Sequence, residues 1–502
     1  MADVKRNIFA NLAGNAWISV LSLVITPLQV NILGIEAYGL VGFVASLQNM
    51  FTVMDLGLSF TITRELASDH SDGRIHSVPL LRTTATIYWA LAILIGVSMI
   101  ASSGAIARVW FNPITMDIGL LEQGLNAVAL YLALRLPIAM YRGILSGLER
   151  MDVLNAVKAA TVSLRLLGGI GVLLVWRDLS AFLYWTSFAA IVEVLAHAVA
   201  CHRTYPALDW RPGFSWPSIR EVWGYSLSMN VLALLGMLIL QLDRLVASKL
   251  LSLESFGYYS LAYTIASGIT LVVMAISTAM MPSFASAHSL GTREVFLRRY
   301  DSASRVMLFV VGFAVFALAF FGEPVLAIWV SPSAAVGAWQ PLALLAVGFW
   351  LYGATQNAQS IAAGSGMPGL PLKASVLSVV PYVVALYVMI GAFGANGAAA
   401  AMLGLNLAFV LTMVPLVHRK ILHISPASWY VKTLLPFLLL GGISFGAPRI
   451  ALWRWAADAG PVVTLGALGG ATLLYGAFGY LLIGASIRND IRALLGKILA
   501  IR

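Results

Sequence analysis

The feature that most constrains this chain is a series of apolar runs, each long enough to cross a lipid bilayer. A bilayer core of about 30 Å requires roughly 20 predominantly apolar residues per helix. Only 10% of the 502 residues are charged, whereas 60% are hydrophobic. The sequence therefore predicts an all-α polytopic membrane protein with about 14 transmembrane helices. The expected spans are 8–33, 38–63, 82–103, 119–141, 154–175, 180–200, 222–248, 256–281, 304–322, 340–362, 373–391, 396–417, 431–447 and 460–485.

Motifs for catalysis, cofactors and metals are missing from the sequence. It contains no GxxxxGK[ST] phosphate-binding loop and no Cys/His cluster with metal-ligand spacing. The single cysteine, Cys201, can form no internal disulfide. No connection between the expected spans is long enough to hold a catalytic domain outside the membrane. We therefore expect a protein that is not an enzyme, has no cofactor or metal, and acts within the bilayer.

The distribution of lysine and arginine predicts the orientation of the spans. The N-terminus, the even-numbered connections and the C-terminal tail carry 23 of the 31 basic residues, whereas the odd-numbered connections carry 5. Basic residues collect in cytoplasmic connections. We therefore expect a multi-pass protein with both termini in the cytoplasm. Topology and attraction to anionic lipids also account for the net charge of +10, so no nucleic-acid partner is expected.

Two segments of the chain resemble one another. Residues 33–68, which begin "LGIEAYGLVGF", align without a gap with residues 251–286, which begin "LSLESFGYYSL". The seven identities are Leu33/Leu251, Glu36/Glu254, Gly39/Gly257, Thr52/Thr270, Ser59/Ser277, Ala67/Ala285 and Ser68/Ser286. Both copies lie between the first and second span of a set of six, which indicates a duplicated unit with parallel orientation. The expected divisions are an N-lobe at 1–201, a cytoplasmic linker at 202–221, a C-lobe at 222–418, and an appended helix pair with a cytoplasmic tail at 419–502.

Several segments resemble a known family of transporters. These are "NIFANLAGNAWISVLSLVITPLQVNILGIEAYGL", "MDLGLSFTITRELAS", "YRGILSGLERMDVLNAVKAA" and above all "QLDRLVASKLLSLESFGYYSLAYTIASG". They resemble the Wzx-like polysaccharide flippases of the multidrug/oligosaccharidyl-lipid/polysaccharide exporter superfamily. The resemblance implies two six-helix lobes arranged as an inverted V.

The resemblance also implies a substrate and a pathway. The substrate would be an oligosaccharide linked to polyprenyl pyrophosphate. It would be moved to the outer leaflet of the bacterial inner membrane by alternating access, for O-antigen, capsule or exopolysaccharide synthesis. Membrane lipids and other membrane proteins of glycan assembly are the further partners that it suggests.

Three arginines are candidates for binding the pyrophosphate. Arg135 and Arg165 lie in the middle of expected spans, and Arg142 follows Arg135 by two helical turns on the same face. A charge within the bilayer needs a cavity or a partner, and guanidinium groups bind phosphate oxygens in a bidentate fork. The alternative is internal ion pairing with Glu193 or Asp55, or, for Arg142, extension of the side chain to the interface.

Four charged residues are candidates for ion coupling or gating, namely Asp55, Glu193, Asp243 and Arg244. Adjacent positions on a helix cannot face one direction. Asp243 and Arg244 are therefore expected to serve lobe packing or closure of an outer gate. For Asp55 both a proton or cation relay and a structural role are open.

Amide side chains within the expected spans are candidates for binding the glycan. They are Asn11 and Asn15 in the first span, Asn230 in the seventh, and Gln356 and Asn357 in the tenth. Amides both donate and accept hydrogen bonds, which suits sugar hydroxyls. The alternative is hydrogen bonding between helices, worth about 0.6 kcal/mol per contact.

Three other functions compete with the flippase interpretation. A multidrug or cation antiporter of the same superfamily would favour acidic groups in its cavity. A peptidoglycan-precursor flippase would be expected to carry basic residues within its first span. A membrane glycan polymerase or ligase would need a long outer loop with acid and base residues.

Overall fold

The computed structural model describes most of the chain. The described residues are 2–53, 58–72, 78–206, 213–217, 220, 239, 241–289, 293–365, 367, 369–455, 460–484 and 487–489, with side chains described except at 2–13, 15, 52–53, 70–72, 281–289 and 363. Within these ranges every regular element is a helix, which confirms the all-α prediction.

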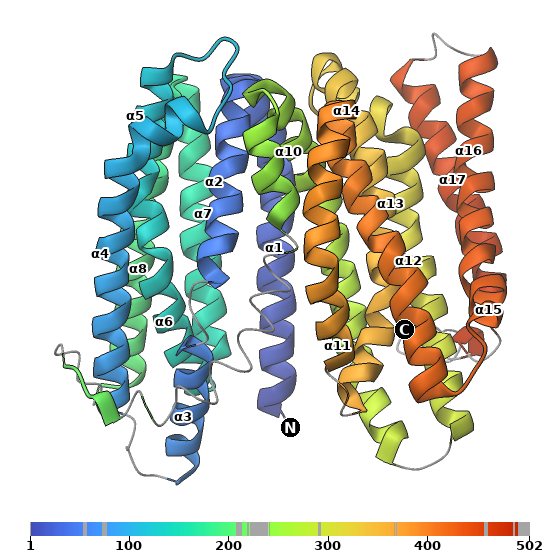
Figure 1. Ribbon diagram of the computed structural model, residues 1–502, viewed down its shortest axis with the longest axis horizontal. Coiled ribbons are helices and arrows are strands. Elements are labelled where there is room, and N and C mark those ends of the chain that lie inside the picture. Colours follow the sequence, from blue (N-terminus) through green and yellow to red (C-terminus); the bar gives the residue numbers. More distant parts are fainter. Residues whose placement is uncertain are drawn as a thin grey trace, which may run out of the picture. The chain divides into compact units, whose positions relative to one another are not determined.

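The chain divides into two compact units, Met1–Ser260 and Leu261–Arg502. In the first unit, α4, α5, α6 and α8 form one packed group, α7 joins it through α8 and α6, and α1 packs against α7 (Figure 1). Residues 241–250 are also helical. The helices of this unit are α1 (Ala2–Leu33), α2 (Ile35–Val53), α3 (Leu58–Asp72), α4 (Val78–Val109), α5 (Ile118–Ala133), α6 (Arg135–Gly147), α7 (Met151–Trp176), α8 (Leu179–Thr204) and the first part of α10 (Leu253–Ser267).

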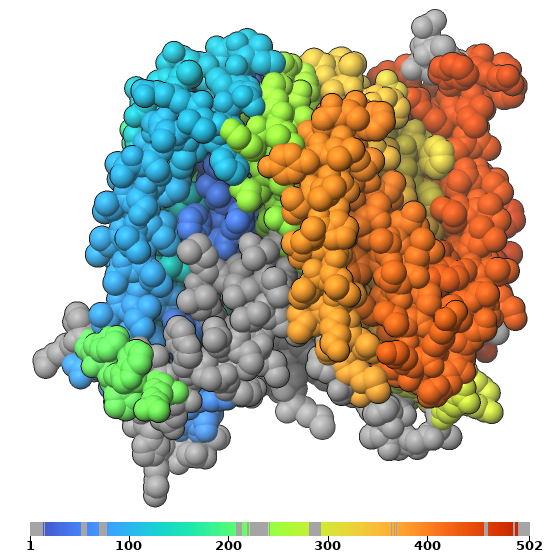
Figure 2. Space-filling view, viewed as in Figure 1, coloured from blue at the N-terminus to red at the C-terminus, as the bar shows by residue number. Residues whose placement is uncertain are grey.

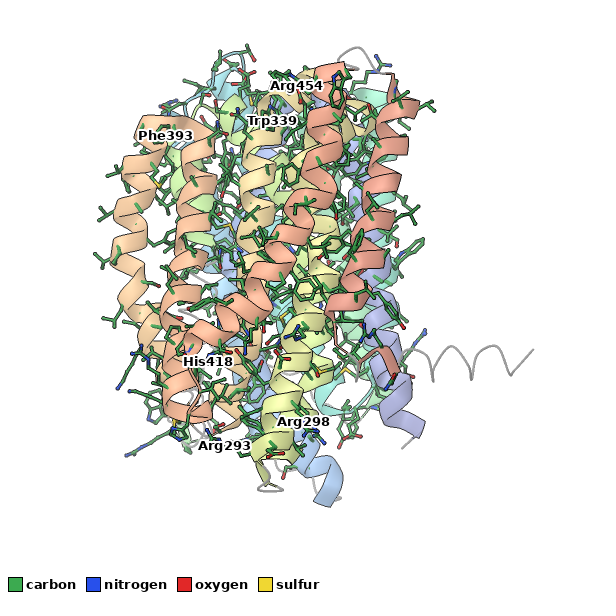
Figure 3. The ribbon with its side chains drawn as sticks, turned by 90° about the vertical axis from the view of Figure 1, so that its right-hand side faces the viewer. Arg293, Arg298, Trp339, Phe393, His418 and Arg454 are labelled. Atoms are coloured by element: carbon green, nitrogen blue, oxygen red, sulfur yellow. The ribbon has the colours of Figure 1, made fainter. Side chains whose placement is uncertain are left out.

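The second unit is built on three long helices packed in sequence order. α12 (Arg293–Trp329) packs against α13 (Pro332–Gly364), which packs against α14 (Gly369–Val417). Arg293, Arg298 and His418 lie toward one end of this unit, and Trp339, Phe393 and Arg454 lie toward the other (Figure 3). Its remaining elements are α11 (Ile269–Ser289), the π-helices η1 (His418–Leu422) and η2 (Tyr430–Leu434), α15 (Pro426–Trp429), α16 (Leu435–Trp455) and α17 (Pro461–Leu482).

Eleven helical stretches in the described residues are long and apolar enough to cross a membrane. The multi-pass prediction is therefore confirmed, while the count of 14 stays a prediction. One stretch, Gly369–Leu422, contains the two expected spans 373–391 and 396–417. Between them α14 is kinked at Gly394, where φ is 58° and ψ is −134°. Glycine adopts such a backbone without steric cost. The expected span 222–248 lies largely outside the described residues.

Helix α16 extends beyond the expected end at residue 447. It continues through Pro448 to Trp455. A proline inside a helix removes one backbone hydrogen bond but does not always end the helix. Arg449, which follows the expected end of this span, lies on the helix, and its Nη2 is 2.7 Å from Glu323 Oε2 on α12.

Candidate functional site: an arginine cluster in the first unit

A break between two helices positions the first predicted arginine. α5 ends at Ala133 and α6 begins at Arg135, with Leu134 between them. Pro137 explains the break, because a proline has no N–H to donate to the carbonyl four residues earlier, here that of Ala133, and its ring clashes with that carbonyl. Arg135 therefore stands in the first turn after a proline-induced break, deep among packed helices.

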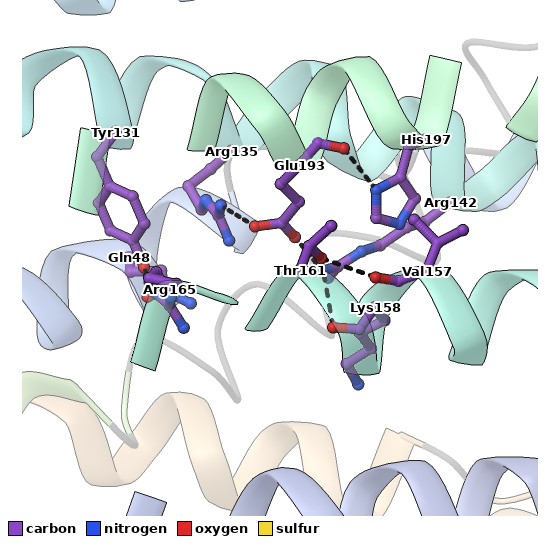
Figure 4. Close-up of polar contacts among 10 residues, drawn as sticks. All are labelled: Gln48, Tyr131, Arg135, Arg142, Val157, Lys158, Thr161, Arg165, Glu193 and His197. Atoms are coloured by element: carbon purple, nitrogen blue, oxygen red, sulfur yellow. Dashed lines mark hydrogen bonds and ion pairs between the residues drawn. The ribbon is translucent and has the colours of Figure 1, made fainter. Parts of the chain in front are cut away.

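Glu193 of α8 joins two of the predicted arginines. Its Oε2 lies 2.7 Å from Arg135 Nη2, and its Oε1 lies 2.6 Å from Arg142 Nη2 (Figure 4). The two arginines therefore share a helix face, as their spacing predicted. The alternative of an ion pair with Glu193 is therefore present for both arginines. Asp55, the other possible partner, lies outside the described residues.

Tyr131 links Arg135 to the third arginine. The Cζ atoms of Arg135 and Arg165 lie 4.6 and 5.3 Å from the centre of the Tyr131 ring, so both cations contact its π-system. Arg165 also donates a hydrogen bond to the Tyr131 hydroxyl, which in turn donates to the Gln48 side chain. We name Tyr131, Arg135, Arg142, Arg165 and Glu193 the arginine cluster.

Neither Tyr131 nor Gln48 was expected from the sequence. For Tyr131 a signal was available, because it precedes Arg135 by four residues, the spacing at which helix neighbours meet. Gln48 lies on α2, far from the arginines in sequence, and no local pattern could have indicated it.

The charges within the arginine cluster do not balance. Three guanidinium groups face one carboxylate, and the Nε atoms of Arg135, Arg142 and Arg165 have no hydrogen-bond partner in the described part of the chain. The side chains of Arg135 and Glu193 are 5% and 2% exposed, whereas that of Arg142 is 28% exposed. A buried excess of positive charge with unused donors is a site suited to an anion.

The adjacent residues Asp243 and Arg244 contact different helices. Asp243 accepts a hydrogen bond from the Tyr259 hydroxyl on α10. Arg244 Nη2 donates to the Gly42 carbonyl on α2 at 2.9 Å. The two side chains therefore point apart, as adjacent helical positions must.

The predicted amide residues are distributed over both units. On α13, Gln356 is half-buried and Asn357 is fully buried, and both amide atoms of Asn357 have no hydrogen-bond partner in the described residues. The side chains of Asn11 and Asn15 on α1, and the whole of Asn230 and Asp55, lie outside the described residues. Nothing in the described geometry brings these residues to the arginine cluster.

A comparison with protein families decides the relationship that the quoted segments suggested. Residues 4–288 match the family described as "Polysaccharide biosynthesis protein", which is more than half of the chain. The chain belongs to this family. A curated relative from Shigella flexneri, named "Putative O-antigen transporter", is 21% identical over 405 residues, covering 80% of this chain and 94% of the relative.

Solved structures show the fold to which this chain is similar. It is similar to the lipid II flippase MurJ in an inward closed conformation, with a TM-score of 0.73, 13% identity and coverage of 96% of this chain and 99% of that one. It is also similar to an inward-facing multidrug resistance MATE family transporter of the MOP superfamily, with a TM-score of 0.68, 13% identity and coverage of 82% and 94%. The transporter fold expected from the resemblance is therefore confirmed.

Proposed function

We propose that this chain is a flippase that moves an oligosaccharide linked to polyprenyl pyrophosphate across the bacterial inner membrane by alternating access, for O-antigen, capsule or exopolysaccharide synthesis. The family and the Shigella flexneri relative support this class of substrate. The observation that carries the proposal is the arginine cluster, whose three guanidinium groups exceed its single carboxylate inside a bundle of apolar helices.

Pyrophosphate is the part of such a substrate that the bilayer opposes most strongly. It can cross the hydrocarbon only where cationic and polar groups replace part of its hydration. Arg135, Arg142 and Arg165 offer guanidinium forks that match phosphate oxygens. In our proposal Glu193 holds the first two arginines in place and is the anion with which the pyrophosphate exchanges.

The increasing exposure from Arg135 to Arg142 suggests an order of contacts. Arg142 is the more exposed of the two residues that share Glu193. We therefore propose that the pyrophosphate meets Arg142 first and Arg135 second, as it moves along one face of α6. Arg165, bound to Tyr131 on the other side of Arg135, completes the path.

The remaining predicted residues have proposed roles around this path. We propose that Asn11, Asn15, Asn230, Gln356 and Asn357 contact the glycan, and that Asp55, Glu193, Asp243 and Arg244 serve coupling or gating. The division into lobes at 1–201 and 222–418 and the cytoplasmic location of both termini are part of the same proposal.

Glycan export by arginine variants tests the proposal. Arg135→Ala and Arg165→Ala should abolish surface glycan in a strain that lacks its own copy, at matched protein levels, and Lys should restore part of it because it lacks the fork. Arg298→Ala is the matched control, because its side chain is 82% exposed. Normal export by both cluster variants would contradict the proposal.

The likeness to MurJ keeps a peptidoglycan-precursor flippase as the second candidate. Rescue of cells depleted of their lipid II flippase, without rescue of glycan export, would favour it. The cation antiporter is less well supported, because the arginine cluster carries more positive than negative charge. Glycan polymerase or ligase activity is not part of the proposal. In cells without this chain, unpolymerised lipid-linked glycan that collects in the outer leaflet would argue for such an enzyme, whereas collection in the cytoplasmic leaflet is what loss of a flippase predicts.

A further inference from the structure

A cavity opens on the first unit, and none of the described residues that line it belongs to the arginine cluster. Its volume is about 770 Å³, within the range of about 300–1,000 Å³ that ligand sites occupy. Its walls come from α4 and α8, and Tyr141 of α6 also lines it. We name this cavity the α4–α8 groove.

Packing explains why the groove is hollow. α4 and α8 each pack against α5 and α6, so a space remains between them over the surface of α6. Small side chains keep that space open, namely Ala85 and Ala90 on α4 and Ala198 on α8. Trp89 and Tyr141 give the groove an aromatic wall.

The groove opens toward surfaces that face acyl chains. Ile93 and Val199, which line it, are 66% and 49% exposed. Leu94 on α4 and Leu195 on α8 lie nearby in sequence and are about as exposed, at 60% and 58%. On helices that span a membrane, exposed aliphatic side chains contact lipid. An occupant can therefore enter sideways from the bilayer.

One end of the groove is basic. His202 and Arg203, in the last turn of α8, line it and are exposed, and no carboxylate is among the described residues that line it. The charge pattern of the sequence assigns this end to the cytoplasm. The groove therefore combines an apolar body with a basic mouth at the level of the lipid headgroups.

The segment 213–217 borders this mouth. The Thr86 hydroxyl, which lines the groove, donates to the Gly213 carbonyl and accepts from the Gly213 N–H, both at 3.1 Å. The Ser215 N–H donates to Thr83 Oγ1 at 2.9 Å. Figure 2 shows this segment in green beside the lower end of α4 in blue.

Two aromatic rings of this segment project outward. Phe214 and Trp216 are stacked with their ring centres 6.5 Å apart, and each side chain is 63% exposed. Exposed aromatic rings at the end of a spanning helix are typical of residues at the headgroup level of a bilayer. The expected linker is therefore fixed to α4 beside the groove, at the depth of a lipid headgroup.

We infer that the α4–α8 groove binds an anionic phospholipid of the same leaflet, with an acyl chain between α4 and α8 and its phosphate at His202 and Arg203. Basic pockets between membrane helices on the cytoplasmic side bind such headgroups. In this inference the bound lipid bridges α8 to the 213–217 segment and so holds this part of the linker against α4. This site is independent of the proposed transport of a glycan.

Photolabelling of the full chain in proteoliposomes tests the inference. The probe is a phosphatidylglycerol with a photoreactive group in its acyl chain, in vesicles of phosphatidylcholine. We expect labelled peptides from α4 and α8 that contain Trp89 and Val199, and at least a five-fold loss of this labelling in Ala198→Phe, which fills the groove, or in His202→Gln/Arg203→Gln, which removes its basic mouth.

Two variants provide matched controls. Leu174→Phe adds a ring at an exposed position of α7, and Arg298→Gln removes an exposed charge from α12. Both should label like the wild-type chain. Equal loss in the controls, or unchanged labelling in the groove variants, would overturn the inference.

Competition identifies the source of the phosphate. Unlabelled phosphatidylglycerol should suppress the labelling, whereas phosphatidylcholine and inorganic phosphate should not. Suppression by phosphatidylcholine to the same extent would contradict the role of the basic mouth. Suppression by a polyprenyl pyrophosphate but not by phosphatidylglycerol would overturn the phospholipid assignment and make the groove a binding site for the transported lipid.

Discussion

Gly39 of α2 and Gly257 of α10 face one another at a contact that leaves no room for a side chain. A Cβ atom on Gly39 would lie 2.5 Å from the Leu253 carbonyl oxygen, and one on Gly257 would lie 2.1 Å from the Ile35 carbonyl oxygen. Small residues permit such close approach of helix backbones in membranes.

The two sides of this contact are equivalent in the sequence repeat. The 218-residue offset that pairs Gly39 with Gly257 also pairs Ile35 with Leu253, the first residues of α2 and α10. It pairs Gly42 with Ser260 as well, and a Cβ on Gly42 would lie 2.5 Å from the Ser260 side chain. Each copy of the repeat therefore presents the same surface to the other, as in an isologous interface.

Gly257→Ala should destabilise the protein, because the added methyl group meets a backbone carbonyl that cannot rotate away. Overpacking of this kind typically costs about 1–3 kcal/mol. Thermal unfolding of the purified chain should show a lower midpoint for Gly257→Ala than for Gly171→Ala, whose added Cβ has no atom within 4 Å. Equal midpoints for the two variants would show that α2 and α10 do not pack as described.

The sequence predicted the helices better than their interruptions. Apolar length located the spans because the bilayer imposes one requirement on all of them. The break at Leu134 was not expected although Pro137 was visible, because a proline in a membrane helix is often tolerated without a break. The end of α16 was predicted too early, at residue 447, because a helix end was expected near Pro448. The helix continues through this proline.

The candidate site was predictable in its residue types but not in its connections. Buried charge is costly in a membrane, so Arg135, Arg165 and Glu193 were conspicuous in the sequence. The sequence could not show that Glu193 joins Arg135 to Arg142, because this contact depends on how α6 packs against α8. It also could not show that Tyr131 lies between two cations, because that contact depends on the packing of α7 as well. No local pattern encodes such packing.

Pro137→Ala should reduce export while leaving the protein at least as stable. The alanine restores the N–H that can bond the Ala133 carbonyl, which favours one continuous helix across Leu134. Arg135 would then move relative to Glu193 and Tyr131. Measured on the same variant, glycan export should fall, whereas the midpoint of thermal unfolding should not. Wild-type export by Pro137→Ala would show that the break does not position Arg135 for function.

Reporter fusions test the predicted orientation. A fusion after Arg502 should be active only with a cytoplasmic reporter, and a fusion within residues 110–117, between α4 and α5, only with a periplasmic one. The reason is the excess of basic residues at both termini and in the even-numbered connections. A periplasmic C-terminus would contradict an even number of spans with both ends in the cytoplasm.

Glu193→Gln should separate the stability of the arginine cluster from its function. Glutamine keeps the shape but removes the carboxylate that Arg135 and Arg142 share, and leaving a buried charge unpaired costs about 3–5 kcal/mol. We expect a lower unfolding midpoint for Glu193→Gln, and partial recovery in Glu193→Gln/Arg135→Gln, because the second change removes one of the unpaired charges. Export should not recover in the double variant, since the guanidinium that receives the pyrophosphate is missing.

The two measurements together distinguish two roles for this ion pair. Recovery of both stability and export would show that Arg135 and Glu193 form a structural ion pair and nothing more. Recovery of stability alone fits an anion site that Glu193 holds until the substrate arrives.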